Sequence, residues 1–264
     1  MSDDNLIIPS AFRDPSEELN GLMNSVCSLN EEQLLHTADR MMDFMLSYKN
    51  LKMVYSCAIR EVKTKFEVLN TEFSVRYQRN PINFISSRLK SNQSIMEKLN
   101  RKQLPLTAES IQKHVLDVAG IRIICSYVDD IYALGDALLR QDDVTLIQKK
   151  DYIENPKANG YRSLHLIISV PVFLADEKHH VPVEVQIRTI AMDFWATLEH
   201  QMKYKQVWDG QQDTVNQLHA CAEKIAVLDQ EMLQIRTRID AVKENHSQED
   251  ELMQKLRRME IPIC

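Results

Sequence analysis

Two short polar blocks in the second half of the chain hold the side chains best suited to chemistry. The first, Lys157–His165, reads KANGYRSLH and combines a turn signal with basic, aromatic and imidazole groups. The second, Val183–Arg188, alternates three apolar residues with an acid, an amide and a guanidinium. Because successive side chains of a strand point to opposite faces, Glu184, Gln186 and Arg188 should share one face. We expect that face to be a reaction surface.

Two carboxylates could act as catalytic and metal-binding groups. Glu184 stands among β-branched residues in mid-strand, where an acid is disfavoured unless it faces water or a partner. Asp117 stands at the entry of an apolar run. Facing each other across a sheet, the two would form a magnesium site for phosphoryl-type transfer, with Glu184 as general base. The alternatives are structural: Asp117 caps a helix or pairs with Arg122, and Glu184 pairs with Arg188 or with a basic residue on a neighbouring strand.

The first block begins as a turn and continues as a strand. Asn159-Gly160 is a turn signal, and Tyr161, Ser163 and His165 would share one face of the strand that follows. The tyrosine ring could stack on a nucleotide base and the histidine could donate a hydrogen bond. A hairpin with a packed tyrosine and a satisfied histidine explains the same residues.

Charge is distributed unevenly along the chain. The formal net charge is −6, which disfavours non-specific binding of nucleic acid through the whole surface. Between Arg88 and Lys102, however, five basic residues accompany one acid, Glu97. We expect this stretch to bind a compact polyanion such as a nucleoside triphosphate, although a solvated helix face is the alternative.

Composition indicates the cellular setting. Among the 264 residues are five cysteines without a Cys-x-x-Cys pair, which argues against a disulfide framework and a zinc ribbon. The first residues carry acids where a signal peptide needs bases, and no apolar run approaches membrane-spanning length. We therefore expect a cytoplasmic protein that neither is exported nor enters a membrane.

The middle of the chain predicts a sheet. β-branched apolar segments at 118–127, 144–153, 163–170 and 181–189 are strand candidates, with a short helix at 130–140 between the first two. They predict an α/β or α+β core with a mixed sheet. Pro171 and Pro182 should bracket a loop at 172–181 whose ends lie at sheet edges.

Helical periodicity dominates both ends. From a predicted N-cap at Asn30, apolar residues recur at helical spacing to Leu69, as one helix or as two joined near Ser47. A second helix at 91–103 places Ser94, Lys98 and Arg101 on one face.

Three further helices are expected after the last strand, at 190–205, 214–242 and 249–258. In the first, Glu199 and Lys203 should form a surface ion pair. The second has heptad spacing, so it either docks on its own domain or pairs between subunits.

Five blocks in a fixed order identify a family. They are Asp117–Arg122, Asp151–Ile153, Pro156–His165, Glu184–Thr189 and Met192–His200. Together they closely resemble the RelA/SpoT-type (p)ppGpp synthetase domain, and the resemblance covers about residues 47 to 240. We expect neither the hydrolase nor the regulatory domains of the long enzymes, so the chain resembles a bacterial small alarmone synthetase, nearer the RelP than the RelQ branch.

The resemblance implies an activity. The β,γ-pyrophosphate of ATP would pass to the ribose 3′-hydroxyl of GDP or GTP with release of AMP, in stringent response signalling. The implied fold is a nucleotidyltransferase-like mixed β-sheet flanked by helices, with long N- and C-terminal helices. Mg²⁺ is the implied cofactor, and a homotetramer formed through the terminal helices is the implied assembly, with no obligatory nucleic acid and no membrane partner. The expected division is a helical extension at 1–46, a catalytic domain at 47–210 and oligomerising helices at 211–264.

The resemblance also assigns site residues. Asp117 and Glu184 would hold magnesium, and Glu184 would help to deprotonate the 3′-hydroxyl. The ATP-binding residues would be Arg88, stacked on adenine, with Lys90, Ser94, Lys98, Arg101, Arg122 and Lys150. The residues for GTP or GDP would be Tyr161, stacked on guanine, with Lys157, Asn159, His165, Gln186, Asp193 and Glu199.

Two positions depart from the RelQ pattern. Lys150 stands where an arginine forms the second plate of the adenine sandwich, and Asp193 replaces an asparagine. A lysine stacks less well than a planar guanidinium, which weakens adenine recognition.

Two other functions remain open. A same-fold enzyme could pyrophosphorylate the 3′ end of tRNA, although the low net basicity weighs against it. A non-catalytic nucleotide-binding protein is the second alternative, and the presence of both Asp117 and Glu184 argues against that.

Overall fold

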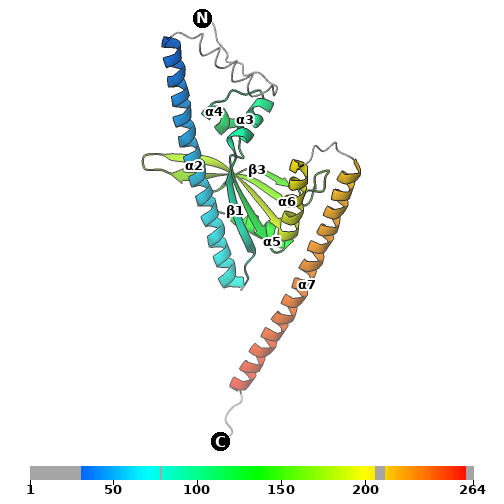
Figure 1. Ribbon diagram of the computed structural model, residues 1–264. Coiled ribbons are helices and arrows are strands. Elements are labelled where there is room, and N and C mark those ends of the chain that lie inside the picture. The colour runs from blue at the N-terminus through cyan, green and yellow to red at the C-terminus, as the bar shows by residue number, and fades with distance from the viewer. Residues whose placement is uncertain (1–30, 78, 206–211, 260–264) are drawn as a thin grey trace. The chain divides into compact units, whose positions relative to one another are not determined.

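A computed structural model describes residues 31–77, 79–205 and 212–259 (Figure 1). The chain divides into two compact units, Met1–Asn50 and Leu51–Cys264. The sheet, its core and its pockets all lie in the second unit. The predicted N-cap Asn30 falls outside the described residues, and the predicted domain boundaries stay predictions.

A five-stranded mixed sheet in the order β1-β2-β5-β4-β3 forms the centre of the second unit. β1 (Ile82–Leu89) runs antiparallel to β2 (Ala119–Cys125), which runs parallel to β5 (Lys178–Thr189). β4 (Leu164–Phe173) pairs antiparallel with both β5 and β3 (Thr145–Asp151). The predicted mixed sheet flanked by helices is confirmed, with β1 as an additional strand that the sequence pattern did not indicate.

β5 shows the alternation that the sequence predicts. Val183, Val185 and Ile187 are fully buried, whereas Glu184 and Gln186 on the other face are partly exposed. The helix α5 (Val128–Leu139) packs against β5 and β2. Its Gly135 approaches so closely that a β-carbon there would meet Leu164 at 3.2 Å. The apolar face of the sheet is thus covered, and the polar face is left for the site.

The connection between β4 and β5 is shorter than predicted. The strands continue to Phe173 and begin again at Lys178, so most of the loop expected at 172–181 is β-hairpin. Pro171 and Pro182 therefore lie inside strands rather than at their ends. Pro171 of β4 lies beyond the part of that strand that pairs with β3, and Pro182 of β5 lies beyond the part that pairs with β2. The N–H that each proline lacks therefore breaks no hydrogen bond to β3 or β2.

The long helix α2 (Glu31–Tyr77) is continuous through Ser47, so the single-helix alternative is confirmed. It ends before Pro81, as expected. In the second unit one face of α2 is buried, through Leu51, Tyr55, Ala58, Ile59, Val62, Phe66 and Leu69.

The predicted amphipathic helix is α3 (Asn92–Arg101), which buries Ile95 and Leu99. The hydroxyl of Ser91 caps it by accepting a hydrogen bond from the Ser94 amide at 3.2 Å. A further short helix, α4 (Ala108–His114), was not predicted.

Two helices follow the sheet. α6 (Ile190–Lys205) begins directly after β5, and α7 (Gln212–Met259) packs against α6 and α5. α7 runs without a break through 249–258, so the expectation of a separate last helix was wrong. Within the described ranges, no helix has an apolar stretch long enough to cross a membrane.

α7 contacts the rest of its unit through Ala222, Asp229 and Arg236, which follow one another at intervals of seven residues. Docking on its own domain is therefore confirmed. Of the predicted heptad residues, Leu218 and Ile225 pack against the buried cluster of Trp195, Ala196 and Ala222, whereas Cys221 is exposed. The five heptad residues further along α7 lie about a quarter turn from the docked residues, at 3.6 residues per turn, and expose about half of their surface. They are Leu228, Met232, Ile235, Ile239 and Val242, called here the apolar seam.

Candidate active site

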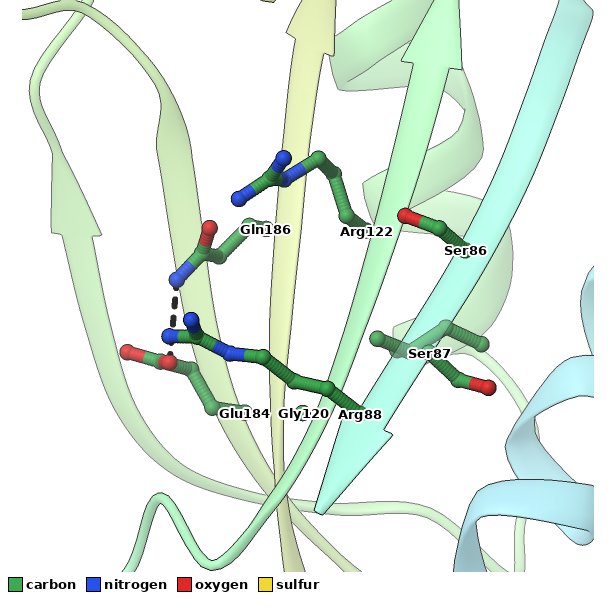
Figure 2. Close-up of a pocket in the computed structure, with 8 residues that line it drawn as sticks. Ser86, Ser87, Arg88, Gly120, Arg122, Glu184 and Gln186 are labelled. Carbon is green, nitrogen blue, oxygen red and sulfur yellow. Dashed lines mark hydrogen bonds between the residues drawn. The ribbon is translucent and has the colours of Figure 1, made fainter. Parts of the chain in front are cut away.

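Three pockets that share lining residues lie along the polar face of the sheet. The first, of about 210 Å³, lies over β1, β2 and β5 and is lined by Ser86, Arg88, Arg122, Glu184 and Gln186 among others. Figure 2 shows Arg88 and Arg122 extending from β1 and β2 toward Glu184 and Gln186 of β5. The cavity has a cationic side and a carboxylate side.

The space in this first pocket depends on Gly120. In the ladder Gly120 pairs with Arg88 on one side and with Glu184 on the other. It contributes no side chain between the two, which leaves room for the cavity.

The other two pockets flank the first. A pocket of about 190 Å³ shares Glu184 and adds Lys150, Tyr152, Lys157 and His165. A larger one, of about 380 Å³, shares Arg88, Arg122 and Gln186 with the first pocket and adds side chains of the first polar block and of α6, namely Tyr161, Thr197, Glu199 and His200. Glu184 therefore lies where the two smaller pockets meet.

Glu184 is a partly buried carboxylate with polar neighbours. Its Oε1 lies 3.4 Å from Nδ1 of His165, and its Oε2 accepts a hydrogen bond from Gln186 at 3.0 Å. Burial raises the pKa of Glu184, but the hydrogen bonds from His165 and Gln186 and the charge of His165 bring it below its ordinary value. Of the two expected pairings, Glu184 therefore pairs with a basic residue on the neighbouring strand β4, His165, and not with Arg188 of its own strand. With a lowered pKa, Glu184 is ionised at neutral pH.

Asp117 is held by two lysines. Its oxygens accept hydrogen bonds from Lys90 at 2.9 Å and Lys98 at 2.8 Å. Burial raises the pKa of Asp117, but the two lysines lower it below its ordinary value. Among the described residues, Asp117 therefore pairs with two lysines, and neither structural alternative, a helix cap or a pair with Arg122, is found. The charge of Asp117 also acts on the pKa of Glu184, so the two carboxylates are close enough to interact.

The first polar block forms an aromatic cluster. The Nζ of Lys157 lies 4.6 Å from the ring centres of both Tyr152 and Tyr161. The Tyr161 hydroxyl lies 2.8 Å from Nε2 of His165. The ring of Tyr152 meets those of Tyr161 and His165 edge-on. Tyr152 was not predicted as a site residue, although it lies inside one of the five family blocks.

Glu199 of α6 closes the cluster from the other side. It accepts a hydrogen bond from the Asn159 side chain at 2.9 Å and is only 8% exposed. Its predicted surface position was therefore wrong. The side chain of Lys203, its expected partner, lies outside the described part of the chain.

Arg188 is a further site residue that the sequence did not single out for binding. It is 3% exposed and contacts Asp193 at 3.3 Å, Gln186 at 2.8 Å and the Tyr161 hydroxyl at 3.3 Å. Arg122 approaches the same oxygen of Asp193 at 3.4 Å. The signal for Arg188 was its place in the alternation of β5, on the face of Glu184 and Gln186.

The predicted ATP-binding residues are not all brought together. Arg88 and Arg122 line the first and third pockets, whereas Lys150 lines the second, so Arg88 and Lys150 do not face each other across one pocket. The other four, Lys90, Ser94, Lys98 and Arg101, line none of the three pockets, and neither does Asp117.

Comparison with known proteins identifies the relatives of the chain. The family model described as "Region found in RelA / SpoT proteins" matches residues 87–209. The GTP pyrophosphokinase YwaC of Bacillus subtilis is 43% identical over 202 residues, which are 76% of this chain and 96% of that protein.

Solved structures agree as well. The small alarmone synthetase 1 of Bacillus subtilis bound to its product pppGpp superposes with a TM-score of 0.67 at 36% identity, covering 73% of this chain and 97% of that one. The same enzyme bound to AMPCPP gives a TM-score of 0.61 at 33% identity, covering 73% and 97%. The chain therefore belongs to the RelA/SpoT family, in the group that includes the small alarmone synthetases.

Proposed function

We propose that the chain transfers the β,γ-pyrophosphate of ATP to the 3′-hydroxyl of GTP or GDP and releases AMP, in a bacterial stringent response. The observation that carries this proposal is the ionised carboxylate of Glu184 where a cationic pocket meets an aromatic one. The names of the relatives support it, since one is a GTP pyrophosphokinase and another was solved with pppGpp and with AMPCPP.

In this reaction Glu184 takes the proton of the 3′-hydroxyl as that oxygen attacks the β-phosphorus of ATP. A bond forms between the 3′-oxygen and the β-phosphorus, and the bond from the β-phosphorus to the oxygen of the α-phosphate breaks. Arg88, Arg122, Lys90 and Lys98 offset the charge on the phosphates. Tyr161 provides the stacking surface for guanine and Lys157 a cation for the acceptor's phosphates.

We propose Mg²⁺ as the cofactor, held by Asp117 and Glu184. No group of three or more metal-binding side chains occurs among the described residues. The pair nevertheless fits, because Mg²⁺ commonly takes one or two carboxylates and completes its shell with water and substrate phosphates. Asp117 would exchange a lysine contact for the metal when ATP brings phosphates for Lys90 and Lys98. The ion would neutralise charge on the transferred group.

The test is direct. Incubation with γ-labelled ATP, magnesium and either GTP or GDP should move label into a penta- or tetraphosphate and release unlabelled AMP in equal amount. Chelation of magnesium should stop the reaction. Labelling of tRNA alone would establish the other acceptor, and nucleotide binding without AMP release would establish a non-catalytic protein.

We also propose a cytoplasmic homotetramer in which the apolar seam of α7 meets a second copy. Its residues alternate at intervals of four and three from Leu228 to Val242, which is the spacing of a coiled-coil interface. They are about half exposed while α7 is docked through another face. An unpartnered apolar stripe of this length favours association.

A further inference from the structure

The loop that carries Tyr161 rests on α7. Gly160 has a φ of 90°, and a β-carbon there would lie only 2.6 Å from the β-carbon of Ala222. The guanidinium of the next-but-one residue, Arg162, pairs with Glu223 at 3.0 Å and donates to the carbonyl of Ala222 at 3.5 Å. The backbone of the loop at Gly160 therefore packs directly against the side chain of Ala222, and no larger residue fits at position 160.

α7 also holds the start of α6. The hydroxyl of Thr189 donates to Asp229 at 2.7 Å and accepts a hydrogen bond from the Met192 amide at 3.1 Å. Thr189 is thus the N-cap of α6, and Asp229 orients the capping hydroxyl. The indole of Trp195 donates to the carbonyl of Leu218 at 3.0 Å, one turn further along α6.

The two supported segments meet at the larger pocket. The loop supplies Tyr161 and α6 supplies Glu199 to the pocket lining. Behind them, Asn159 of the loop and Asp193 of α6 hydrogen-bond to the lining residues Glu199 and Arg188. The hydrogen bond between Asn159 and Glu199 joins the loop to α6. Any shift of α7 against the sheet would change the distance between these segments.

We propose that α7 positions the acceptor pocket and that Asp229 is the positioning residue that fixes α6 within it. This inference rests on the proposed function. Asp229 is 8% exposed and does not line any of the three pockets, so it acts through Thr189 rather than on the nucleotide. On the ATP side, Lys90, Lys98 and Asp117 hold one another. Arg122 of β2 also contacts Asp193 of α6, at 3.4 Å. Loss of Asp229 should therefore affect the acceptor much more strongly than ATP, but not exclusively.

The experiment compares Asp229→Ala, Asp229→Asn and Arg236→Ala in the full chain. Asparagine keeps an oxygen that can accept from Thr189, whereas alanine removes it. Arg236 lies on the same docked stripe of α7 but pairs with Asp129 of α5, outside the three pockets. It serves as the matched control for weakened docking.

The KM values for GTP and ATP should separate the roles. Asp229→Ala should raise the KM for GTP about tenfold, because small displacements in a preorganised site have large effects, while the KM for ATP changes less than about twofold. Asp229→Asn should restore the KM for GTP to within about threefold of wild type. Arg236→Ala should lower the melting temperature without changing the ratio of the two KM values. Equal effects on both substrates, or an asparagine variant as defective as alanine, would overturn the proposal.

A measurement without turnover keeps the inference separate from the proposed activity. Hydrogen exchange of the amides in 157–163 and 190–193 should accelerate in Asp229→Ala and stay at wild-type rates in Asp229→Asn, even if no pyrophosphate transfer is found. Should Asp229→Ala fail to fold, Glu223→Ala provides the second variant, since Glu223 is 52% exposed. It should raise exchange in the loop and the KM for GTP about threefold, and unchanged loop exchange would contradict the positioning role.

Discussion

The imidazole of His165 lies 3.4 Å from the carboxylate of Glu184. Its other nitrogen lies 2.8 Å from the hydroxyl of Tyr161. Because a carboxylate can only accept, the Nδ1–H of His165 faces Glu184, and in the tautomer with Nδ1 alone protonated the Nε2 accepts from the Tyr161 hydroxyl. One ring thus joins the aromatic part of the site to its carboxylate.

This contact predicts a change in pH dependence. His165 lowers the pKa of Glu184 against the effect of burial, so His165→Ala should raise that pKa. The proposed general base acts in its deprotonated form, so the acid limb of the pH–rate profile should move to higher pH. Tyr161→Phe leaves the contact between His165 and Glu184 in place and should keep the acid limb where it is. An unmoved limb in His165→Ala would refute the link.

Glu184→Gln should abolish most turnover while nucleotides still bind. Glutamine keeps the shape and the polar contacts but cannot take the proton of the 3′-hydroxyl, which corresponds to about 10²- to 10⁴-fold in kcat. AMP release and equilibrium binding of GTP would be measured together. Glu177→Gln is the matched control, because Glu177 pairs with His179 at the exposed β4–β5 turn. Wild-type turnover in Glu184→Gln would exclude it as the base.

Tyr161→Ala should weaken binding of the acceptor. Stacking of a base on an aromatic ring contributes about 1–3 kcal/mol, so the KM for GTP should rise at least about fivefold. Tyr161→Phe retains the ring and should bind GTP nearly as wild type does. A KM for ATP that rose as strongly would show that Tyr161 does not belong to the acceptor side.

Tyr55 should be replaceable by phenylalanine with a gain in stability. Its side chain is 1% exposed, and its hydroxyl has no hydrogen-bond partner among the described residues. A buried unsatisfied polar group is destabilising, so Tyr55→Phe should raise the free energy of unfolding by about 1 kcal/mol in a urea titration. Tyr132→Phe should do the opposite, because the Tyr132 hydroxyl contacts Asp151 at 3.4 Å. A loss of stability in Tyr55→Phe would indicate an unrecognised partner.

The apolar seam gives a prediction on assembly. Ile235→Glu should convert the proposed tetramer to smaller species, since a charge in a heptad core position opposes association. Light scattering coupled to size exclusion would report the mass. Gln230→Glu adds the same charge at an exposed position of α7 outside the seam and should leave the mass unchanged. Equal masses for both variants and wild type would place the interface elsewhere.

Local patterns in the sequence predicted the local structure. The alternation in β5 reported which residues face the core, and the polar residues left on the other face line the pockets. β1 was not predicted because it is an edge strand in which Ile82 is the only buried residue, so the alternation of apolar and polar residues is weak. The sequence assigned Arg88 to a basic stretch, but without a predicted strand it did not show which way the Arg88 side chain points.

Contacts between distant residues could not be predicted in the same way. Lys90 and Lys98 meet Asp117 across 27 and 19 residues, and no spacing in the sequence encodes that. The docked stripe of α7 escaped for a different reason. It contains Asp229 and Arg236, and a search for apolar periodicity passes over charged residues that pair in the interior.

Asp229 and Arg236 are seven residues apart on α7, and both hold the helix to its own domain. The number of residues between them is therefore more strictly constrained than the types of those residues. One residue inserted between them would turn the following helix by about 100° and present Ile235 where Arg236 now meets Asp129. One residue deleted would present Thr237 there. Substitutions on the outer face leave both anchor points in place, so this segment can vary in residue type but not in residue number.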